Sequence, residues 1–400
     1  MIIVDDSTFM RQSLTRMFSS DPEINVIDTA KNGQEALEKV KLLKPDVITL
    51  DIEMPVMDGL TALQRIRSEC SPPPAVLMCS SLTAEGSREA LRALRLGAAD
   101  VIEKDGDKFG LNSETMRDEL LAKIKAIASG HRDRIALTAT RLAGQSTSGA
   151  AGFSRVPPTT PPGGLPPASA GRRAIRTRQF ELVVIGSSTG GPPVLETIVT
   201  ALPATYRIPV IIAQHMPALF TKSLAERLDD ICEVSVVHAE NGMKLHRGTV
   251  YIAPGGKQTR VKMHLGSMVL EVNEEPAALL YKPCINELFS SAARVTGAKT
   301  LAVICTGMGD DGCMGARDLY ARNATIIAQD AETSVVYGMP RAVAVANLID
   351  SAMPPEDLAA AVATAGAGLS ELAAESVPAA RPAVTPAATS SIASPLRRAS

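Results

Sequence analysis

Short apolar runs alternate with amphipathic segments over residues 1–128, and this alternation restricts the fold more than any other feature of the sequence. The segments between the runs, such as Gly33–Leu43 and Leu60–Ser68, place apolar residues at helical spacing. Repeated units of strand and helix of this size predict an α/β domain with a parallel sheet and helices on both faces. The predicted strands are Ile2–Val4, Val26–Thr29, Val47–Leu50, Ala75–Cys79 and Ala99–Ile102.

Acidic, hydroxyl and basic side chains stand at the ends of four of these strands, where ligands usually bind in a parallel sheet. They are Asp5, Asp6, Asp51, Ser80 and Lys104. Three carboxylates in one pocket repel one another unless a hard divalent cation binds them, and oxygen ligands of this kind suit magnesium. The serine hydroxyl and the lysine could then hold a bound anion. Each acid alone could be a helix cap, so the prediction depends on the combination.

The segments DDS, DIEMPVMDG, SS and K together resemble the receiver domains of two-component response regulators. The resemblance covers nearly all of this first part and implies a flavodoxin-type, doubly wound sheet. It implies that Asp51 accepts a phosphoryl group from a histidine kinase of the chemotaxis system. It further implies that Asp5 and Asp6 bind magnesium together with Asp51, and that Ser80 and Lys104 sense the phosphoryl group.

Helical and strand periodicity disappears after residue 128, and prolines accumulate. Six prolines lie between Pro157 and Pro167, in a stretch that cannot bury enough apolar surface to offset its ordering entropy. We therefore predict a disordered linker over residues 129–178 and a disordered tail, rich in Ala, Pro, Ser and Thr, over residues 374–400. The linker ends in a basic cluster that we interpret as solvated charge at a domain edge: Arg172, Arg173, Arg176 and Arg178.

A second domain, predicted over residues 179–373, opens with the apolar run Leu182–Ile185, which breaks into small, turn-forming residues. Gly186 and Gly190 flank Ser188 in a G-x-S-x-G pattern, which suits a serine on a sharp bend between a strand and a helix. The alternative is a glycine-rich turn whose N–H groups hold a phosphate. Ser188 is therefore a candidate nucleophile that needs a base and an acid from elsewhere in the chain.

The candidate base is His215, which follows the predicted strand Pro209–Ala213. This position lies at the carboxyl end of a neighbouring parallel strand, within reach of Ser188. A histidine beside a serine turn can accept the serine proton. The other histidines lie near the linker or in polar, hairpin-like contexts: His131, His238, His246 and His264.

The candidate acid lies in TGMGDDG, Thr306–Gly312, after the predicted strand Thr300–Cys305. Such a loop could be a metal site, a second anion cradle or the third member of a triad. Metal binding is the weaker idea, because the ligands are few and three glycines leave the loop geometrically loose. Asp311 or Asp310 could instead orient the imidazole of His215.

The resulting order is Ser, His, Asp, whereas in α/β-hydrolases the acid precedes the histidine. No histidine follows Asp311. In a hydrolase of the usual order, His238, His246 or His264 would have to be the base, with an acid between it and Ser188. We consider that arrangement the less favoured one.

IGSSTGG, QHMP and TGMGDDG together resemble the catalytic domain of the chemotaxis protein-glutamate methylesterases, from about residue 181 to 372. The resemblance implies a second doubly wound, Rossmann-like parallel sheet that needs no cofactor. It implies hydrolysis of glutamyl methyl esters on methyl-accepting chemoreceptors, and it leaves deamidation of glutamine side chains as a second activity. The family roles fall on Ser188 as nucleophile, His215 as general base and Asp311 as its acid, with N–H groups near Thr189 and Met308 as oxyanion donors.

Several positions depart from the patterns of the two families. Val101 stands where receivers often have an aromatic switch residue, and Asp105 stands where proline is usual. In the second domain Asp310 replaces a common asparagine, Gly256 and Gln258 replace an acid and a histidine, and KPCINELF replaces a more usual RPSVDVLF. The proposed triad is unaffected, but the wall of the cleft matches the family less well.

Composition disfavours several other classes of function. A net charge of −2 and a pI near 6.3 give no overall basic footprint for nucleic acid or acidic membranes. The second half also lacks the compact basic helix-turn-helix of a DNA-binding regulator. Six cysteines without C-x-x-C spacing favour a reducing compartment. Asp5 and Asp6 precede any long apolar region, and no run approaches about 18 apolar residues, so we expect a soluble cytoplasmic protein without membrane insertion.

The sequence therefore favours a phosphorylation-activated esterase. The main alternative is a signalling adaptor whose second domain binds a partner without turnover. Ester hydrolysis that depends on Ser188 would exclude the adaptor.

Overall fold

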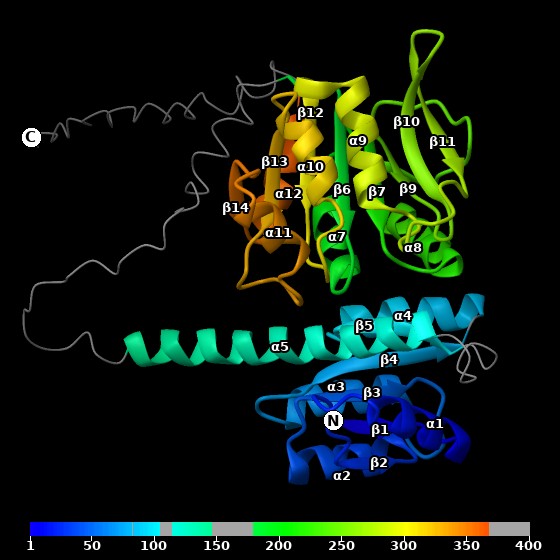
Figure 1. Cartoon of the computed structure of the whole chain (residues 1–400), viewed down its shortest axis with the longest axis vertical. Coiled ribbons are helices and arrows are strands. Elements are labelled where there is room, and N and C mark those ends of the chain that lie inside the picture. Colours follow the sequence, from blue (N-terminus) through cyan, green and yellow to red (C-terminus); the bar gives the residue numbers. More distant parts are fainter. Residues whose placement is uncertain (82, 105–113, 146–178, 368–400) are drawn as a thin grey trace, which may run out of the picture. The chain divides into compact units, whose positions relative to one another are not determined.

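The first sheet, in the computed structural model of the chain, contains five parallel strands in the order β2-β1-β3-β4-β5 (Figure 1). This is the flavodoxin-type order predicted from the sequence. The strands are β1 Ile2–Val4, β2 Asp28–Ala30, β3 Val47–Asp51, β4 Ala75–Ser81 and β5 Asp100–Lys104. The structure describes residues 1–81, 83–104, 114–145 and 179–367. Asp105, the four linker arginines and the predicted tail lie outside these ranges.

Helices cover both faces of this sheet because alternate strand residues point in opposite directions. Ile2, Val4 and Leu50 face α2, α3 and α4, whereas Ile3 and Val47 face α1 and α5. The helices are α1 Thr8–Phe18, α2 Gly33–Leu43, α3 Gly59–Glu69, α4 Ala84–Arg95 and α5 Glu114–Gln145.

The first four helices begin at side chains that accept a hydrogen bond from a backbone N–H of the first turn. These capping residues are Ser7, Asn32, Asp58 and Thr83. Residues of these types satisfy N–H groups that would otherwise lack an acceptor, and replacing such a cap with alanine costs about 1 kcal/mol. The sequence thus fixes these helix starts locally.

Helix α5 extends to Gln145, past the predicted domain boundary at residue 128. Residues 129–145, which the sequence analysis assigned to the linker, are therefore helical. Arg134 explains why part of this extension is ordered, because its guanidinium donates to the carbonyl oxygens of Ser334 (3.0 Å) and Val335 (2.9 Å) in the second domain. The rest of the predicted linker, residues 146–178, lies outside the described residues.

The second sheet contains seven parallel strands in the order β14-β13-β12-β6-β7-β9-β8, which confirms the predicted doubly wound fold. The chain therefore contains two α/β domains of this kind. The strands are β6 Leu182–Ser187, β7 Val210–Gln214, β8 Ser235–His238, β9 Thr249–Ile252, β12 Thr300–Ile304, β13 Thr325–Gln329 and β14 Ser351–Met353.

The central strands of this sheet are apolar and buried on both faces, as expected for a parallel sheet. Val183 and Ile185 of β6 face α7, α8 and α12, whereas Leu182 and Val184 face α9, α10 and α11. The helices are α7 Gly191–Thr200, α8 Ala218–Ile231, α9 Ile285–Val295, α10 Cys313–Tyr320, α11 Met339–Val345 and α12 Pro355–Gly366, with a 3₁₀ turn at Gly297–Lys299.

A separate antiparallel hairpin, β10 Gln258–His264 and β11 Ser267–Asn273, stands beside this sheet (Figure 1). Its buried residues Val261, Leu270 and Val272 pack with α9, so the hairpin anchors the segment that enters α9.

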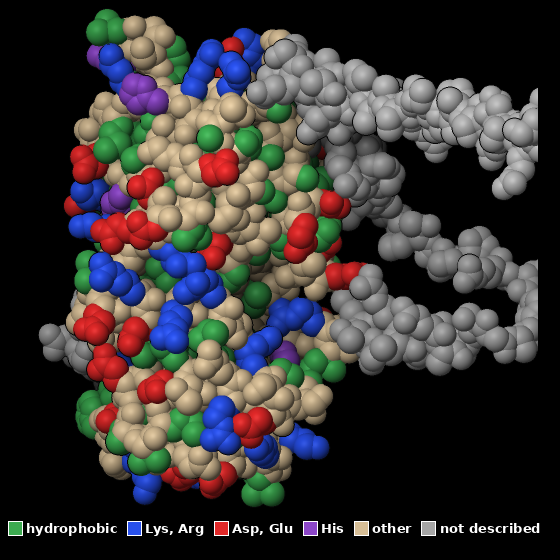
Figure 2. Space-filling view, turned by 180° about the vertical axis from the view of Figure 1, so that it is seen from behind, with side chains coloured by type: hydrophobic (Ala, Val, Ile, Leu, Met, Phe, Trp, Pro, Cys, Tyr) green, Lys and Arg blue, Asp and Glu red, His purple; other side chains and the backbone are tan. Residues whose placement is uncertain are grey.

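Basic and acidic side chains are intermixed over the face shown in Figure 2. That face therefore carries charges of both signs, as expected from a net charge near zero. Within the described ranges, no helix combines the length and the apolarity needed to cross a bilayer.

Candidate active site

Three loops that carry the predicted triad meet at the carboxyl ends of β6, β7 and β12. Strand β6 lies between β7 and β12, and the chain first adds β7 on one side and later β12 on the other. Such a reversal of strand order is the usual place for a binding crevice in an open α/β sheet. The topology therefore brings Ser188, His215 and Asp311 to one edge of the sheet.

The turn after β6 holds Ser188 through close backbone packing. Gly190 has a φ of +78°, and a Cβ atom there would lie 2.5 Å from Val335, so only glycine fits without strain. The fully buried amide of Gln214 accepts a hydrogen bond from the Ser187 hydroxyl (2.5 Å) and donates one to the Ser188 carbonyl (2.9 Å). One side chain at the end of β7 thus fixes the serine turn against the histidine segment.

The imidazole of His215 is 9% exposed, and its Nε2 atom lies 2.9 Å from Oδ2 of Asp311. Because the carboxylate can only accept, Nε2 carries the proton and Nδ1 is the basic nitrogen. Nδ1 is buried and has no hydrogen-bond partner among the described residues. The Ser188 hydroxyl, which lines the same cavity, likewise makes no hydrogen bond to any described residue. The base nitrogen is therefore available to the serine.

The Asp311 carboxylate lies at the N-terminus of α9. It accepts hydrogen bonds from the N–H groups of Ile285 (2.7 Å) and Asn286 (3.0 Å), and the Cys284 thiol lies 3.2 Å from its Oδ1 atom. Burial alone would raise the pKa of this carboxyl, but the bonds from His215 and from the two backbone N–H groups outweigh burial and lower it. Asp310, by contrast, is exposed, so only Asp311 is positioned to orient the histidine.

Two backbone N–H groups at this edge of the sheet lack an acceptor. The amides of Thr189 and Met308 donate to no described residue, and both residues line the cavity that contains Ser188. Thr189 is buried and Met308 is half-buried. Two N–H groups without an acceptor beside a serine are the kind of donors that can bind an oxyanion.

His238, one of the alternative bases, lies 3.1 Å from the Thr221 hydroxyl and does not line this cavity. The structure thus brings none of the alternative histidines into the cavity of Ser188.

Residues of the first domain line the same cavity, whose volume is about 270 Å³. The Thr189 hydroxyl donates a hydrogen bond of 2.6 Å to Asp100 of β5, and Asp100 also forms an ion pair of 2.9 Å with Lys123 of α5. Val101, the departure from the aromatic switch pattern, is another lining residue. The first domain therefore occupies part of the space in front of Ser188.

Sequence reasoning missed three residues that contact this site: Gln214, Asp100 and Tyr281. The sequence did contain a signal for Gln214, because this amide side chain directly follows an apolar run and precedes the predicted base. Nothing local marked Asp100 or Tyr281, because each contacts the site across the fold. Tyr281 stacks on His215, with ring centroids 4.3 Å apart and an interplanar angle of 8°.

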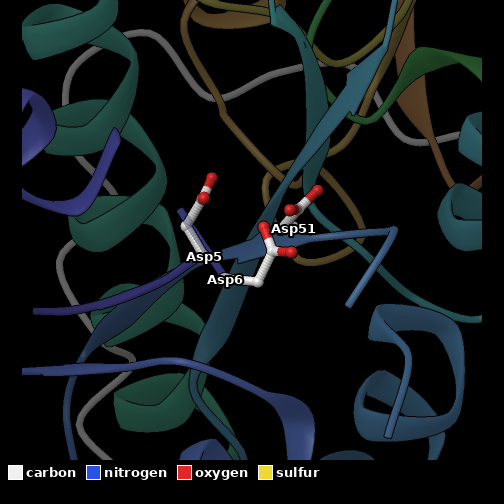
Figure 3. A group of neighbouring side chains, drawn as sticks. All are labelled: Asp5, Asp6 and Asp51. Carbon is white, nitrogen blue, oxygen red and sulfur yellow. The ribbon is translucent and has the colours of Figure 1, made fainter. Parts of the chain in front are cut away.

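The acidic pocket of the first domain contains Asp5, Asp6 and Asp51, which extend from the ends of β1 and β3 (Figure 3). One oxygen from each carboxylate lies within 4.8 Å of the other two. A set of three carboxylate oxygens at this spacing fits a hard divalent cation such as magnesium. Lys104 partly offsets the repulsion, because its ammonium lies 2.7 Å from Asp5 and 2.5 Å from Asp51.

Burial raises the pKa of Asp51 to about 6, and the nearby ammonium of Lys104 lowers it only in part. Ser80 lies at the end of β4 and donates a hydrogen bond of 2.9 Å to the Gly86 carbonyl. All five predicted residues of the first domain thus lie at the carboxyl ends of β1, β3, β4 and β5.

Comparisons with known proteins show the family of the chain. The CheB methylesterase family matches residues 183–362, and the response regulator receiver domain matches residues 1–114. A protein-glutamate methylesterase/protein-glutamine glutaminase 1 of Oleidesulfovibrio alaskensis is 43% identical over 371 residues, which cover 91% of this chain and 98% of that protein. The chain belongs to the CheB methylesterase family.

Two further proteins are similar to this chain, one over most of its length and one over its second domain. A protein of the same name from Vibrio vulnificus is 42% identical over 364 residues, which cover 90% of this chain and 96% of that protein. The crystal structure of the Thermotoga maritima CheB methylesterase catalytic domain is 39% identical, covers 46% of this chain and 98% of that domain, and has a TM-score of 0.45.

Proposed function

We propose that the chain is a phosphorylation-regulated hydrolase that removes methyl groups from glutamate methyl esters of chemoreceptors and deamidates receptor glutamines. The observation that carries this proposal is the buried Nδ1 atom of His215. It has no partner among the described residues, lines the cavity of Ser188 and belongs to a ring whose Nε2 is bound to Asp311. This is the arrangement that proton removal from a serine requires.

The first half of the reaction forms an acyl-enzyme. Ser188 Oγ attacks the ester carbonyl carbon while Nδ1 of His215 takes the hydroxyl proton, and Asp311 stabilises the imidazolium that results. The N–H groups of Thr189 and Met308 bind the oxyanion of the tetrahedral intermediate. The intermediate expels methanol, or ammonia from a glutamine, after His215 returns the proton to the leaving group.

The second half restores the enzyme. Water attacks the acyl carbon and gives its proton to His215, which then protonates Ser188 as the bond to the serine breaks. The product is a glutamate carboxylate. Both halves use the same base and the same oxyanion donors, so no cofactor is required in this domain.

The acidic pocket supplies the regulation in this proposal. Asp51 accepts the phosphoryl group from a histidine kinase, Asp5 and Asp6 hold magnesium together with Asp51, and Ser80 and Lys104 contact the phosphoryl oxygens. The close spacing of the three carboxylates supports this assignment. Bound magnesium would neutralise charge on the phosphodonor and on the aspartyl phosphate.

Strand β5 connects the two sites, because Lys104 at its end contacts Asp51 and Asp100 at its start contacts Thr189. Phosphorylation replaces the carboxylate that Lys104 now contacts. We infer that this change biases β5 toward a state in which Asp100 no longer holds Thr189 and the cleft opens.

Methanol release from methylated receptor tests the catalytic part of the proposal. Ser188→Ala and His215→Ala should each reduce turnover about 10⁴- to 10⁶-fold, and the double variant should lose little more, because the two residues share one proton transfer. Additive losses would contradict the shared step. Absence of methanol release from the phosphorylated wild-type chain would favour the adaptor over the esterase.

A further inference from the structure

The catalytic histidine is covered on one face by an aromatic ring that the proposed mechanism does not use. The rings of Tyr281 and His215 are nearly parallel, at 8°, and their centroids lie 4.3 Å apart. Tyr281 belongs to the segment before α9 and lines the same cavity as Ser188. The contact therefore lies within the reaction space.

Several buried hydrogen bonds hold this segment in place. The amide of Gln258, which is fully buried, donates to the Tyr281 carbonyl (2.8 Å) and accepts from the Cys284 N–H (2.7 Å). Gly256 adds a bond of 3.0 Å from its N–H to the Lys282 carbonyl. One glutamine thus spans the distance between the stacked ring and the N-terminus of α9.

That helix end is also the site that binds the catalytic acid. The first N–H groups of α9, from Ile285 and Asn286, donate to Asp311, which in turn accepts from His215. The stacked ring that contacts His215 and the N–H groups that bind its acid therefore belong to neighbouring parts of one hydrogen-bonded segment.

We propose that Tyr281 is a positioning residue for ester hydrolysis, which holds the imidazole plane of His215 so that Nδ1 stays available to the cavity that it shares with Ser188. The inference depends on the proposed esterase activity. A single hydrogen bond from Nε2 to Asp311 leaves the imidazole free to swing about that bond, and a stacked ring removes this freedom.

The stack also favours the charged form of the base. When His215 takes the serine proton, its ring becomes a cation that lies against the electron-rich face of Tyr281. Contacts between a cation and an aromatic face contribute about 1 to 2 kcal/mol at partly desolvated sites. The ring also keeps water away from one face of the imidazole, which strengthens the bond to Asp311.

Replacement of Tyr281 in the full chain tests the proposal. Tyr281→Leu should lower kcat about 5- to 30-fold, which is the factor that corresponds to about 1 to 2 kcal/mol, with KM changed by less than about twofold. Tyr281→Phe keeps the ring and should stay within about twofold of the wild-type kcat. Tyr320→Leu is the matched control, because Tyr320 is an exposed tyrosine at the end of α10, and it should leave both constants unchanged.

Nuclear magnetic resonance gives an independent readout. A ring stacked on the imidazole shields its carbon-bound protons, so these protons in His215 should resonate upfield in the wild type and in Tyr281→Phe, and move downfield in Tyr281→Leu. The chain contains five histidines, and loss of one signal in His215→Asn assigns the resonance. Unchanged signals from the other four histidines show that each variant is folded.

The outcomes separate this inference from the proposed function. An equal loss of kcat in Tyr281→Phe and Tyr281→Leu would assign the effect to the hydroxyl and overturn the stacking role. A folded Tyr281→Leu protein with unchanged kcat would also overturn it. A wild-type chain that shows the upfield signals but releases no methanol would refute the esterase, whereas missing upfield signals in an active wild type would refute only the stack.

Discussion

The two centres of the molecule each contain a carboxylate that is buried to the same extent, yet their pKa values move in opposite directions. Asp51 and Asp311 are both 4% exposed. Burial raises the pKa of Asp51 to about 6, because the charge of Asp5 adds to the effect and Lys104 offsets it only in part. The pKa of Asp311 is lowered despite burial, because His215 and the N–H groups of Ile285 and Asn286 bind its charged form.

Partners rather than burial therefore decide what each carboxylate can do. The pocket of Asp51 brings negatively charged groups together, and an incoming cation can relieve the repulsion between them. The pocket of Asp311 supplies a fixed set of donors, which favour the ionised form of this acid and orient it. The first arrangement suits a regulatory site that changes state, and the second suits a catalytic site that must not.

The largest effect on turnover is expected from the replacement of Asp311 itself. Asp311→Asn should reduce turnover about 10⁴-fold, because the amide would donate to Nε2 of His215 and force the proton onto Nδ1, the nitrogen that must act as base. Asp310→Asn makes the same chemical change one residue away at an exposed position and should reduce methanol release only a few-fold or less. Equal losses, or the opposite ranking, would refute the assignment of the acid.

The next largest effect concerns the charge added at Asp51. A small-molecule phosphodonor with magnesium should raise the esterase rate of the full chain about 5- to 150-fold, which corresponds to a coupling of about 1 to 3 kcal/mol. Asp51→Asn should abolish the rise and leave the basal rate intact. A rise that persists in Asp51→Asn would place the phosphoryl group elsewhere.

The opposite pKa shifts also predict opposite effects on stability. A raised pKa means that the folded state loses stability as pH increases from about 4 to about 6, the interval between the unfolded and folded pKa values. Without divalent cations, Asp51→Asn should therefore stabilise the first domain at pH 8 by on the order of 1 to 3 kcal/mol, and should have little effect near pH 4. Hydrogen exchange of the β3 amides measures this difference.

Asp311→Asn should change the stability of its domain in the opposite direction. A lowered pKa contributes stability that is present above the unfolded pKa and is lost as the pH falls through the folded value. The substitution should therefore destabilise the second domain at neutral pH. Stabilisation of the α9 amides in the same exchange experiment would contradict the role of the Ile285 and Asn286 N–H groups as donors to a charged carboxylate.

The smallest effect is expected at the contact that joins the two regions. Asp100→Ala removes the acceptor of the Thr189 hydroxyl and should raise the rate of the unphosphorylated chain by up to about 10-fold, the value of one hydrogen bond to a charged group. The phosphorylated rate should not change. An unchanged basal rate would mean that the cleft opens without breaking this bond.

Much of the fold and of the two sites could be predicted from local patterns. Helix α2 occupies the predicted residues Gly33–Leu43, and the strands for which a range was predicted, β1 to β7 and β12, begin within two residues of it. Asp51 follows its apolar run directly, so its place at a strand end was evident. The prediction did not include the part of α5 past residue 128, from which Arg134 donates hydrogen bonds to Ser334 and Val335.

The sequence by itself determined the alternation of strands and helices along the chain, the capped helix starts and the residue types at the strand ends. Each of these depends on neighbours within a few positions. Only the tertiary structure decided which groups meet. Asp311 caps a helix that begins 26 residues earlier in the chain, and Tyr281 reaches His215 from another loop. Asp100 binds Thr189 from a different domain. Such contacts depend on how the layers pack, which no local pattern encodes.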